Sequence, residues 1–527
     1  MTDPTRLLAH EMAARLHSGE TTSRELTEAH LAGAERDNRA LNAWLVIDRE
    51  GALEAADAAD ARLTAARAEG RDGLEALHPL LGIPIALKDL ISVEGGQCTA
   101  GSRILEGYIA PYDAHITERL RDAGAVILGK TNMDEFAMGS SNEHSAYGPV
   151  ANPWDLETVP GGSSGGSAVA VSAFHAPLSI GTDTGGSIRQ PAALNGIVGL
   201  KPTYGRVSRY GIVAFASSLD QIGPFARDVR DAAALLHAIA GRDERDSTSA
   251  PVPVPDALLD LPSGDHAAAD LRGKRLGLPR EYFVAGMDPD VERRIREAVA
   301  ALEGAGARVE EVSLPHTDYG LATYYIVAPA EASANLARYD GIRYGPRLGD
   351  GDVLGNYLAT RGRGFGPEVK RRIMLGTYAL SAGYYDAFYL KAQKVRTLIK
   401  QDFDKLWEQG FDALVAPTSP SVAFRFGAKM ADPVAMYLSD ACTLPVNMAG
   451  LPGISIPCGL SEGLPVGLQL IGAPWSELEL FTLARGYEAI TSSADWRGLE
   501  PAQLGLAADP AAQTPAERAA ELAGAAR

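Results

Sequence analysis

Two glycine- and serine-rich segments, with a lysine upstream of them, carry the residue types that acyl transfer requires. The first segment, residues 161–167, reads GGSSGGS, and the second, residues 181–191, reads GTDTGGSIRQP. Lys88 directly follows the apolar residues 83–87. Serines among bare backbone amides can supply a nucleophile and an oxyanion hole, and a lysine with apolar neighbours can supply a base. The pattern therefore predicts an enzyme that transfers or hydrolyses acyl groups.

Two other interpretations of the glycine–serine segments are weaker. Flexible linkers are rich in glycine and serine, but they do not end in Ile-Arg-Gln-Pro or alternate with an apolar run such as residues 168–180. Residues 161–165 also fit the G-x-S-x-G nucleophile elbow of α/β-hydrolases, which follows directly on a hydrophobic strand. Residues 152–160 contain two prolines and no strand pattern, so the elbow lacks its structural context.

The two segments resemble the signature of the amidase signature enzymes. The resemblance implies a Ser–Ser–Lys triad, with Ser187 as the nucleophile, Ser163 as a bridging serine in a cis peptide, and Lys88 as a base in its neutral form. It also implies the fold of that family, an α/β structure with a large mixed, mostly parallel β-sheet core covered by helices on both faces.

The surroundings of Lys88 fit the role of a base. A lysine accepts a proton near neutral pH only if burial lowers its pKa, and residues 83–87 offer the apolar setting that this requires. The alternative is that Lys88 pairs with its neighbour Asp89. The two serine segments downstream favour the base.

The second segment also predicts how the oxyanion is bound. Because two glycines leave backbone N–H groups uncovered, we expect an oxyanion hole made by the amides of Thr184, Gly185, Gly186 and Ser187. Asp183 and Arg189 are expected to hold the shape of this loop rather than to take part in the chemistry.

The composition is that of a globular protein, since 46% of the 527 residues are hydrophobic and 22% are charged. Three cysteines, Cys98, Cys442 and Cys458, lie far apart and indicate neither disulfides nor a metal site, which favours the cytoplasm. The N-terminus lacks the apolar region of a signal peptide. No apolar run reaches the roughly 18 residues of a membrane span.

Three regions are expected along the chain. Residues 1–75 form an N-terminal helical segment packed on the core, residues 76–490 form the α/β domain, and residues 491–527 form a C-terminal tail. The polar, proline-rich residues 243–270 indicate a connection between two lobes.

Local patterns predict several elements of these regions. Thr22 and Glu25 form the capping box of a helix. A helix over residues 114–123 precedes a strand over 126–129, which gives a βαβ-like rhythm. Residues 368–409 predict one long helix or a tightly broken pair.

Within its family the chain resembles the glutaminase subunits of tRNA-dependent amidotransferases over roughly residues 5–490. Residues 129–141 and 201–211 carry this likeness in the first half, and residues 331–341 and 364–377 carry it in the second, where general amidases vary widely. The resemblance implies that Ser187 attacks the side-chain amide of glutamine. The released ammonia would pass to a partner subunit, which amidates the glutamate on Glu-tRNA(Gln); whether Asp-tRNA(Asn) also serves as an acceptor is left open.

The implied assembly is a heterotrimer with two other subunits, without a cofactor in this chain and with ATP and Mg²⁺ at the partner. The net charge of −18, from 49 basic and 67 acidic side chains, disfavours direct contact with nucleic acid. We therefore expect the partner to make the main contacts with tRNA.

A free amino acid needs a cation for its carboxylate and an anion for its ammonium group. The resemblance assigns these roles to Arg372 and Asp440, and it adds Tyr324 and Gly139 to the substrate site. Arg372 could instead lie on a solvated helix face, and Asp440 could be a helix cap. Whether Tyr324 or Tyr325 lines the pocket is left open.

The second functional hypothesis is a stand-alone amidase that acts on small amides and needs no partner. A charged Arg372 and Asp440 pair suits free glutamine, whereas an apolar pocket suits an aryl or acyl amide. A catalytically inactive scaffold is disfavoured because Lys88, Ser163 and Ser187 are all present.

Overall fold

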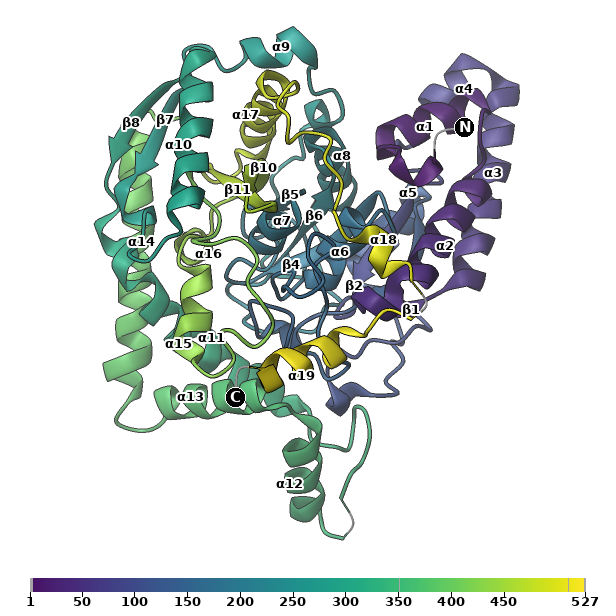
Figure 1. Ribbon diagram of the computed structural model, residues 1–527. Helices are drawn as coiled ribbons and strands as arrows, with labels where there is room; N and C mark the ends of the chain where they lie inside the picture. The colour runs from purple at the N-terminus through teal and green to yellow at the C-terminus, as the bar shows by residue number, and fades with distance from the viewer. Residues whose placement is uncertain (1–2, 350, 510, 526–527) are drawn as a thin grey trace.

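The computed structural model describes residues 3–349, 351–509 and 511–525. Within these residues, eleven strands form one sheet in the order β1-β3-β2-β4-β6-β5-β10-β11-β9-β7-β8 (Figure 1). The strands are β1 (Trp44–Ile47), β2 (Pro84–Lys88), β3 (Val126–Thr131), β4 (Leu178–Asp183), β5 (Val198–Lys201), β6 (Gln221–Ala226), β7 (Arg275–Pro279), β8 (Arg308–Val312), β9 (Ala413–Pro417), β10 (Gly453–Ser461) and β11 (Leu464–Ile471).

The sheet is mixed, as predicted, but its parallel pairs lie only toward its two ends. They are found in the groups β3-β2-β4 and β9-β7-β8. From β4 through β6, β5, β10 and β11 to β9 the neighbours are antiparallel, so the expectation of a mostly parallel sheet is corrected for this middle part. The reason is local for β10 and β11, because a tight turn such as theirs can join only antiparallel strands.

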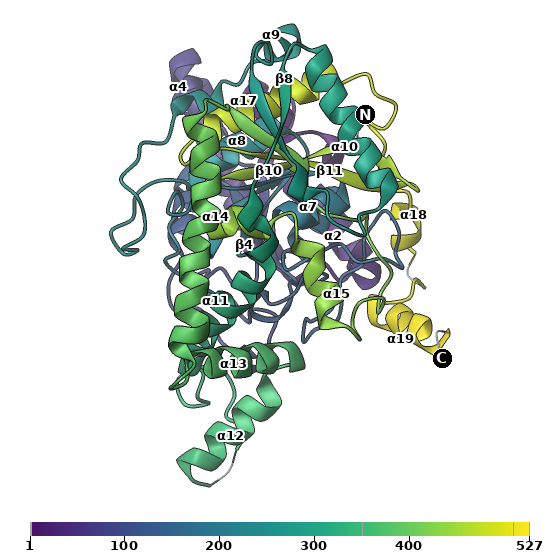
Figure 2. The ribbon, with the colours of Figure 1, turned by 90° about the vertical axis from the view of Figure 1, so that its left-hand side faces the viewer.

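Helices flank the sheet, as two perpendicular views show (Figures 1 and 2). Those of the first half are α1 (Ala9–Ser18), α2 (Ser23–Leu41), α3 (Arg49–Glu69), α4 (Arg71–Glu75), α5 (His115–Ala123), α6 (Gly165–Ser172), α7 (Arg189–Asn195) and α8 (Val229–Ile239). Those of the second half are α9 (Gly264–Ala269), α10 (Pro289–Gly304), α11 (Gly320–Asn335), α12 (Val353–Gly364), α13 (Pro367–Leu380), α14 (Lys391–Glu408), α15 (Pro433–Tyr437), α16 (Leu444–Ala449), α17 (Glu477–Ile490), α18 (Leu504–Ala507) and α19 (Pro515–Ala525). None of the described helices is long and apolar enough to cross a membrane.

The N-terminal segment begins as its sequence predicts. The Glu25 amide donates to Thr22 Oγ1 at 3.1 Å, and the Thr22 amide donates to Glu25 Oε2 at 3.0 Å, which confirms the capping box of α2. The segment is not helical throughout, because it also contributes β1, which pairs antiparallel with β3 at one edge of the sheet. The N-terminal helices are thereby joined to the core.

The long helical pattern over residues 368–409 is the broken pair rather than a single helix. Helix α13 ends at Leu380, a short π-helix covers Tyr385–Leu390, and α14 starts at Lys391. The C-cap of α13, Ser381, is extended, and Gly383 between the two helices has φ +86°, a left-handed conformation that favours glycine. The break turns the chain at the corner between α13 and α14.

The proline-rich connection and the C-terminal tail both contain short helices. Residues 243–270 include α9 and a turn of 3₁₀ helix at Asp256–Leu259. In the C-terminal tail, the buried Arg518 of α19 donates to the Ala40 carbonyl of α2 at 3.0 Å. The tail therefore packs on the N-terminal helices (Figure 1).

Candidate active site

The residues of the predicted triad come from three neighbouring elements. Lys88 is the last residue of β2, Ser163 precedes α6, and Ser187 lies between β4 and α7. Because β2 and β4 are parallel neighbours, their carboxyl ends meet at one edge of the sheet, where binding sites of α/β proteins form. The Gly162 amide donates to Gln190 Oε1 at 3.0 Å, which ties the two serine loops together.

Lys88 is completely buried and points at three hydroxyl groups. Its Nζ lies 2.8 Å from Ser163 Oγ, 2.8 Å from Ser164 Oγ and 2.9 Å from Thr182 Oγ1. Two of the three predicted triad residues are therefore in direct contact. Ser187 is 7% exposed, and no hydrogen bond between its hydroxyl and Ser163 is found within the described residues.

The alternative pairing of Lys88 with Asp89 does not form. Asp89 Oδ1 instead lies 3.2 Å from Nζ of Lys130, which extends from the neighbouring strand β3. Its other oxygen, Oδ2, accepts the Thr99 amide at 2.9 Å. Successive side chains along an extended chain point to opposite faces of the sheet, so the side chains of Lys88 and Asp89 lie in different surroundings.

Burial lowers the pKa of Lys88 to about 7. The carboxylates of Asp134, Asp183 and Asp220 act in the opposite direction, because they stabilise the ammonium form. The balance leaves a large fraction of Lys88 neutral near physiological pH, which is the form that can accept a proton.

The hydrogen bonds around a neutral Lys88 can be assigned by counting protons. A neutral amine has two N–H bonds and one lone pair, so one of its three hydroxyl neighbours must donate to it. Ser164 Oγ donates to the Thr182 carbonyl at 3.0 Å and can only accept from Lys88. The donor is therefore Ser163 or Thr182, and a donating Ser163 has the geometry of the predicted relay.

The peptide bond between Gly162 and Ser163 is cis, as the resemblance implied. Gly162 cannot be replaced without displacement of its surroundings, because a Cβ there would overlap the Asp134 carboxylate. The Ser163 carbonyl accepts the Asp134 amide at 3.2 Å, and the whole residue is buried. The backbone of Ser163 is thus fixed by its surroundings both before and after the residue.

The loop that carries Ser187 is wrapped around a buried ion pair. Asp183 lies 3.0 Å from Arg189 Nε, and both side chains are fully buried. Asp183 also accepts the amide of Gly186 at 2.8 Å and that of Ile188 at 3.3 Å. The prediction that Asp183 and Arg189 hold the loop is confirmed.

The conformation of this loop corrects one of the predicted oxyanion-hole donors, Gly186. The Gly186 amide is engaged by the Asp183 carboxylate, because the loop curls over that side chain, whereas no acceptor is found for the Thr184 or Gly185 amide within the described residues. Gly186 has φ +141°, and a Cβ there would overlap the hydroxyl of Thr443. Thr184, Gly185 and Ser187 remain candidate donors, and Gly186 shapes the turn.

Arg372 does not lie on a solvated helix face. Its side chain is only 2% exposed, and Nε donates to Glu368 Oε1 at 2.8 Å on the same helix, α13. The guanidinium carbon lies 5.2 Å from the ring centroid of Tyr325 and 5.4 Å from that of Tyr437. A buried arginine walled by aromatic rings suits bidentate recognition of a carboxylate.

Asp440 does not cap a helix, and its backbone lies beside the nucleophile loop. It ends a 3₁₀ turn (Leu438–Asp440), and its Oδ2 accepts the Ser140 hydroxyl at 2.5 Å. Burial raises the pKa of Asp440 to about 7. Thr443 Oγ1 lies 3.0 Å from the Asp440 carbonyl and 2.6 Å from the Gly185 carbonyl, which brings the acid beside the loop of Ser187.

Tyr324 and Tyr325 have different surroundings in the structure. Tyr324 packs on the nucleophile loop, since a Cβ on Gly185 would come within 2.9 Å of its ring. Tyr325 stacks on Tyr437 with ring centroids 3.7 Å apart and belongs to the surroundings of Arg372. Gly139 lies against the Asp134 carboxylate, with which a Cβ at this position would overlap.

Sequence reasoning missed four residues of this arrangement. Ser164 and Thr182 contact Lys88, and both lie inside the two signature segments, so their position was a usable signal. Glu368 pairs with Arg372, and Thr443 holds the Gly185 carbonyl. Neither has a local sequence signal, because each reaches the site only through the fold.

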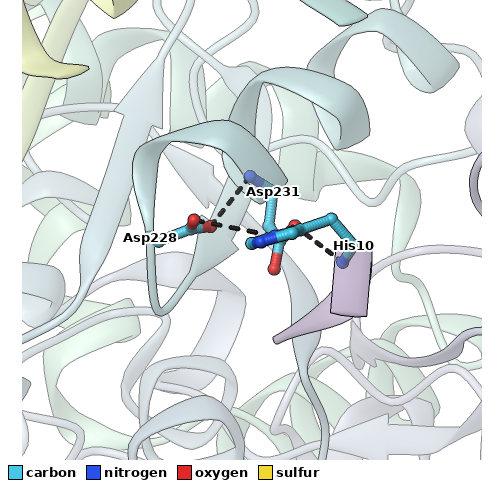
Figure 3. A group of neighbouring side chains, drawn as sticks. All are labelled: His10, Asp228 and Asp231. Atoms are coloured by element: carbon cyan, nitrogen blue, oxygen red, sulfur yellow. Dashed lines mark hydrogen bonds and ion pairs between the residues drawn. The ribbon is translucent and has the colours of Figure 1, made fainter. Parts of the chain in front are cut away.

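One group of side chains outside this site has the composition of a metal site. His10, Asp228 and Asp231 offer atoms within 4.8 Å of one another, as Figure 3 shows. These atoms are already engaged, because Asp231 accepts the Ala9 amide at 2.6 Å and approaches His10 Nδ1 at 2.9 Å, and Asp228 accepts the Asp231 amide at 2.9 Å. The group links α1 to the start of α8.

The comparisons with known proteins agree with this geometry. Residues 25–481 match the Amidase family. The A-type subunit of glutamyl-tRNA(Gln) amidotransferase from Moorella thermoacetica is 58% identical over 485 residues, which cover 92% of this chain and 96% of the relative. The protein of the same name from Myxococcus xanthus is 57% identical over 490 residues, covering 93% of this chain and 97% of the relative.

Two solved structures are similar over nearly the whole chain. The A-type subunit of glutamyl-tRNA(Gln) amidotransferase from Thermotoga maritima has a TM-score of 0.74 and 41% identity, covering 93% of this chain and 95% of that chain. The native peptide amidase from Stenotrophomonas maltophilia has a TM-score of 0.78 and 35% identity, covering 93% of this chain and 98% of that chain. The fold is therefore shared by amidotransferase subunits and by a peptide amidase.

Proposed function

The chain belongs to the amidase family, and from this premise we propose that it is the glutamine-hydrolysing subunit of a tRNA-dependent amidotransferase. The observation that carries the proposal is a pair of buried ionisable groups, Arg372 and Asp440, the second of which adjoins the nucleophile loop through Thr443. Arg372 and Asp440 offer a cation and an anion for the carboxylate and the ammonium group of a free amino acid. A pocket for an uncharged acyl amide needs neither group.

The proposed reaction passes through an ester on Ser187. Ser187 Oγ attacks the side-chain carbonyl carbon of glutamine, Ser163 takes its proton, and Ser163 gives its own proton to the neutral Lys88. The carbon–nitrogen bond then breaks, and ammonia leaves with the proton returned through Ser163. Water cleaves the ester by the same route, with free amides of the loop stabilising the oxyanion.

The remaining steps belong to the partner subunits of a proposed heterotrimer. ATP and Mg²⁺ would act at a partner, which activates the glutamate on Glu-tRNA(Gln) for attack by ammonia. With a net charge of −18, this chain is suited to leave most tRNA contacts to that partner. The cytoplasm is the compartment in which such an enzyme meets its tRNA.

The pH dependence of hydrolysis follows from Lys88. Only the neutral amine can accept a proton, so kcat/KM should be low in acid, rise through about pH 7 and level off above it. Asp440 must be ionised to bind the ammonium group, and its pKa of about 7 acts in the same direction for glutamine. Profiles measured for glutamine and for a small uncharged amide separate the two effects, because the amide reports on Lys88 alone. A rate that falls as pH rises through 7 would contradict the assignment of Lys88.

Substitution of Arg372 or Asp440 tests the choice of substrate. Arg372→Ala or Asp440→Ala leaves one charge of bound glutamine without its partner, which costs about 2–5 kcal/mol of binding free energy. The Michaelis constant for glutamine should therefore rise by about 1.4 to 3.6 orders of magnitude. Hydrolysis of a small uncharged amide should change little, because Ser187, Ser163 and Lys88 remain in place.

The matched control is Arg371→Ala. Arg371 is an exposed arginine of the same helix that also pairs with Glu368. This substitution should leave both Michaelis constants near those of the wild type. Equal losses for both substrates in the Arg372 and Asp440 variants would make those residues structural. A wild-type chain that prefers uncharged amides, even with partner subunits present, would favour the stand-alone amidase.

A further inference from the structure

A buried carboxylate next to the nucleophile loop has no cation beside it. Asp220 directly precedes β6 and is only 3% exposed. In the part of the chain that the structure describes, no basic side chain lies within ion-pair distance of it. Burial raises the pKa of Asp220 to about 6, so the group is charged at neutral pH. A buried charge without a counterion lowers stability unless hydrogen bonds compensate, and such groups cluster at functional sites.

Hydrogen bonds from two segments of the chain compensate the charge of Asp220. Its Oδ2 accepts the Phe215 amide at 3.0 Å, and the Ala216 amide donates to Oδ1 at 3.1 Å and to Oδ2 at 3.0 Å. On the other side, Oδ1 accepts the Thr184 hydroxyl at 2.8 Å. The carboxylate therefore joins residues 215–220 to the loop that carries Ser187.

Residues 215–220 are themselves fixed to two helices of the second half. The Ser218 amide donates to Glu331 Oε2 of α11 at 2.8 Å. Arg396 of α14 donates through Nη2 to the Ser218 carbonyl at 2.9 Å. Asp220 thus reaches the nucleophile loop from a segment that is held in place.

Thr184 lies in the part of the nucleophile loop that Asp183 does not hold. Asp183 accepts the amides of Gly186 and Ile188, whereas no acceptor is found for the Thr184 amide within the described residues. The χ1 torsion of a threonine has few accessible values. A hydrogen bond that fixes the Thr184 hydroxyl therefore also restricts the Thr184 backbone, and with it the direction of the next amide, that of Gly185.

We propose that Asp220 is a positioning residue that orients the oxyanion-binding amides of Thr184 and Gly185 through the Thr184 hydroxyl. An oxyanion hole accelerates a reaction only when its donors already point to the place where negative charge develops. The proposal rests on the ester mechanism at Ser187 proposed above, but not on the choice of glutamine as the substrate.

Thr184→Val tests the hydroxyl without a change of charge. Loss of a whole oxyanion donor costs roughly 10²- to 10³-fold in kcat, and misorientation should cost a part of this, on the order of 10- to 100-fold. The loss should be equal for glutamine and for a small uncharged amide, with the Michaelis constant for glutamine near that of the wild type. Thr184→Ser keeps the hydroxyl and should restore most of the rate.

Asp220→Asn separates the charge from the hydrogen bond. The amides of Phe215 and Ala216 need an acceptor, so the asparagine oxygen should face them and its NH₂ group should donate to the Thr184 hydroxyl. With this bond kept in reverse, kcat above pH 7 should stay within about threefold of the wild type. The midpoint of the pH profile should move to lower pH. Burial lowers the pKa of Lys88, and Asp220 is one of the carboxylates that oppose this effect.

Asp220→Ala removes both the charge and the hydrogen bond. It should lose about as much kcat as Thr184→Val and show the same shift of the pH midpoint as Asp220→Asn. The double variant Asp220→Ala/Thr184→Val should be no slower than Asp220→Ala, because both residues act through one hydrogen bond. The matched control is Asp243→Ala, which removes a buried carboxylate that accepts the Ser208 hydroxyl at 2.8 Å and the Arg245 amide at 3.1 Å. Its hydrolysis rate should stay near that of the wild type.

All variants are assayed as the full chain with a small uncharged amide, and thermal unfolding is followed alongside. A rate of Thr184→Val within about threefold of the wild type would overturn the proposal, and so would a double variant whose defect is the product of the single ones. If Asp220→Ala does not fold, Thr184→Val and Thr184→Ser decide. A wild-type chain that hydrolyses the small amide but not glutamine contradicts the proposed function and leaves the comparison of these variants intact.

Discussion

Replacement of Ser187 by alanine is expected to abolish glutamine hydrolysis. Loss of the nucleophile removes the covalent route, and comparable losses in hydrolases are on the order of 10⁴- to 10⁶-fold. The fold should be unaffected, because the Ser187 hydroxyl makes no hydrogen bond within the described residues and the loop is held by Asp183 and Arg189. The measurement is ammonia release from glutamine by the assembled enzyme, with thermal unfolding of the variant alongside.

A suitable control for this variant is Ser172→Ala. Ser172 is also a buried serine, on α6, but its hydroxyl lies 3.4 Å from the Val169 carbonyl of its own helix and 3.4 Å from Asn195 Oδ1, away from the triad. Its hydrolysis rate should stay near that of the wild type. Activity of Ser187→Ala within tenfold of the wild type would exclude Ser187 as the nucleophile.

Replacement of Lys88 by alanine should cost several orders of magnitude in the acylation rate. This loss exceeds the roughly 10²- to 10⁴-fold share of general-base catalysis, because Lys88, Ser163 and Ser187 act as a unit. Ser163→Ala should be severe but somewhat milder. The double variant Lys88→Ala/Ser163→Ala should be no slower than Lys88→Ala alone, as expected for two members of one proton relay. Single-turnover rates with glutamine measure all three.

Lys201→Ala is the matched control for the loss of a buried lysine. Burial lowers the pKa of Lys201 to about 7, as it does for Lys88, but Lys201 Nζ donates to the Pro202 carbonyl at 2.8 Å and contacts neither serine. Both variants therefore remove a buried amine of similar pKa, and only one removes the proposed base. Equal losses in the two variants, or a double variant whose defect is the product of the single ones, would argue against the relay.

The local features of this chain could be read from its sequence because neighbouring residues determine them. The capping box of Thr22 and Glu25 depends on residues within one helical turn. The second signature segment likewise places Asp183, Ser187 and Arg189 within seven consecutive positions. For these features local and tertiary preferences agree.

Other features depend on residues that only the fold brings close. Asp89 forms its ion pair with Lys130 of a neighbouring strand and not with Lys88. Arg372 looks solvated within its basic sequence, yet Tyr325 and Tyr437 cover it from other helices. The antiparallel pairing in the middle of the sheet could not be predicted either, because the hydrophobic pattern of a buried strand does not indicate the direction of that strand.

Gly186 illustrates a third reason why the sequence does not predict every part of the site. Its sequence context, two glycines before a serine, indicates an uncovered amide, but the carboxylate that engages this amide belongs to Asp183 three residues earlier. Whether that side chain turns toward the loop depends on Arg189 and Asn447, which hold its oxygens in place. The direction of a backbone N–H group is therefore a tertiary property even inside a short motif.

The most direct test of the central claim is to identify the residue that becomes acylated. Wild-type enzyme is quenched in acid during turnover of glutamine, digested and analysed by mass spectrometry for a glutamyl ester. The account predicts the ester on Ser187 in the wild type and none in Ser187→Ala or Lys88→Ala. A glutamyl group on any other residue, or steady turnover without a covalent intermediate, would contradict it.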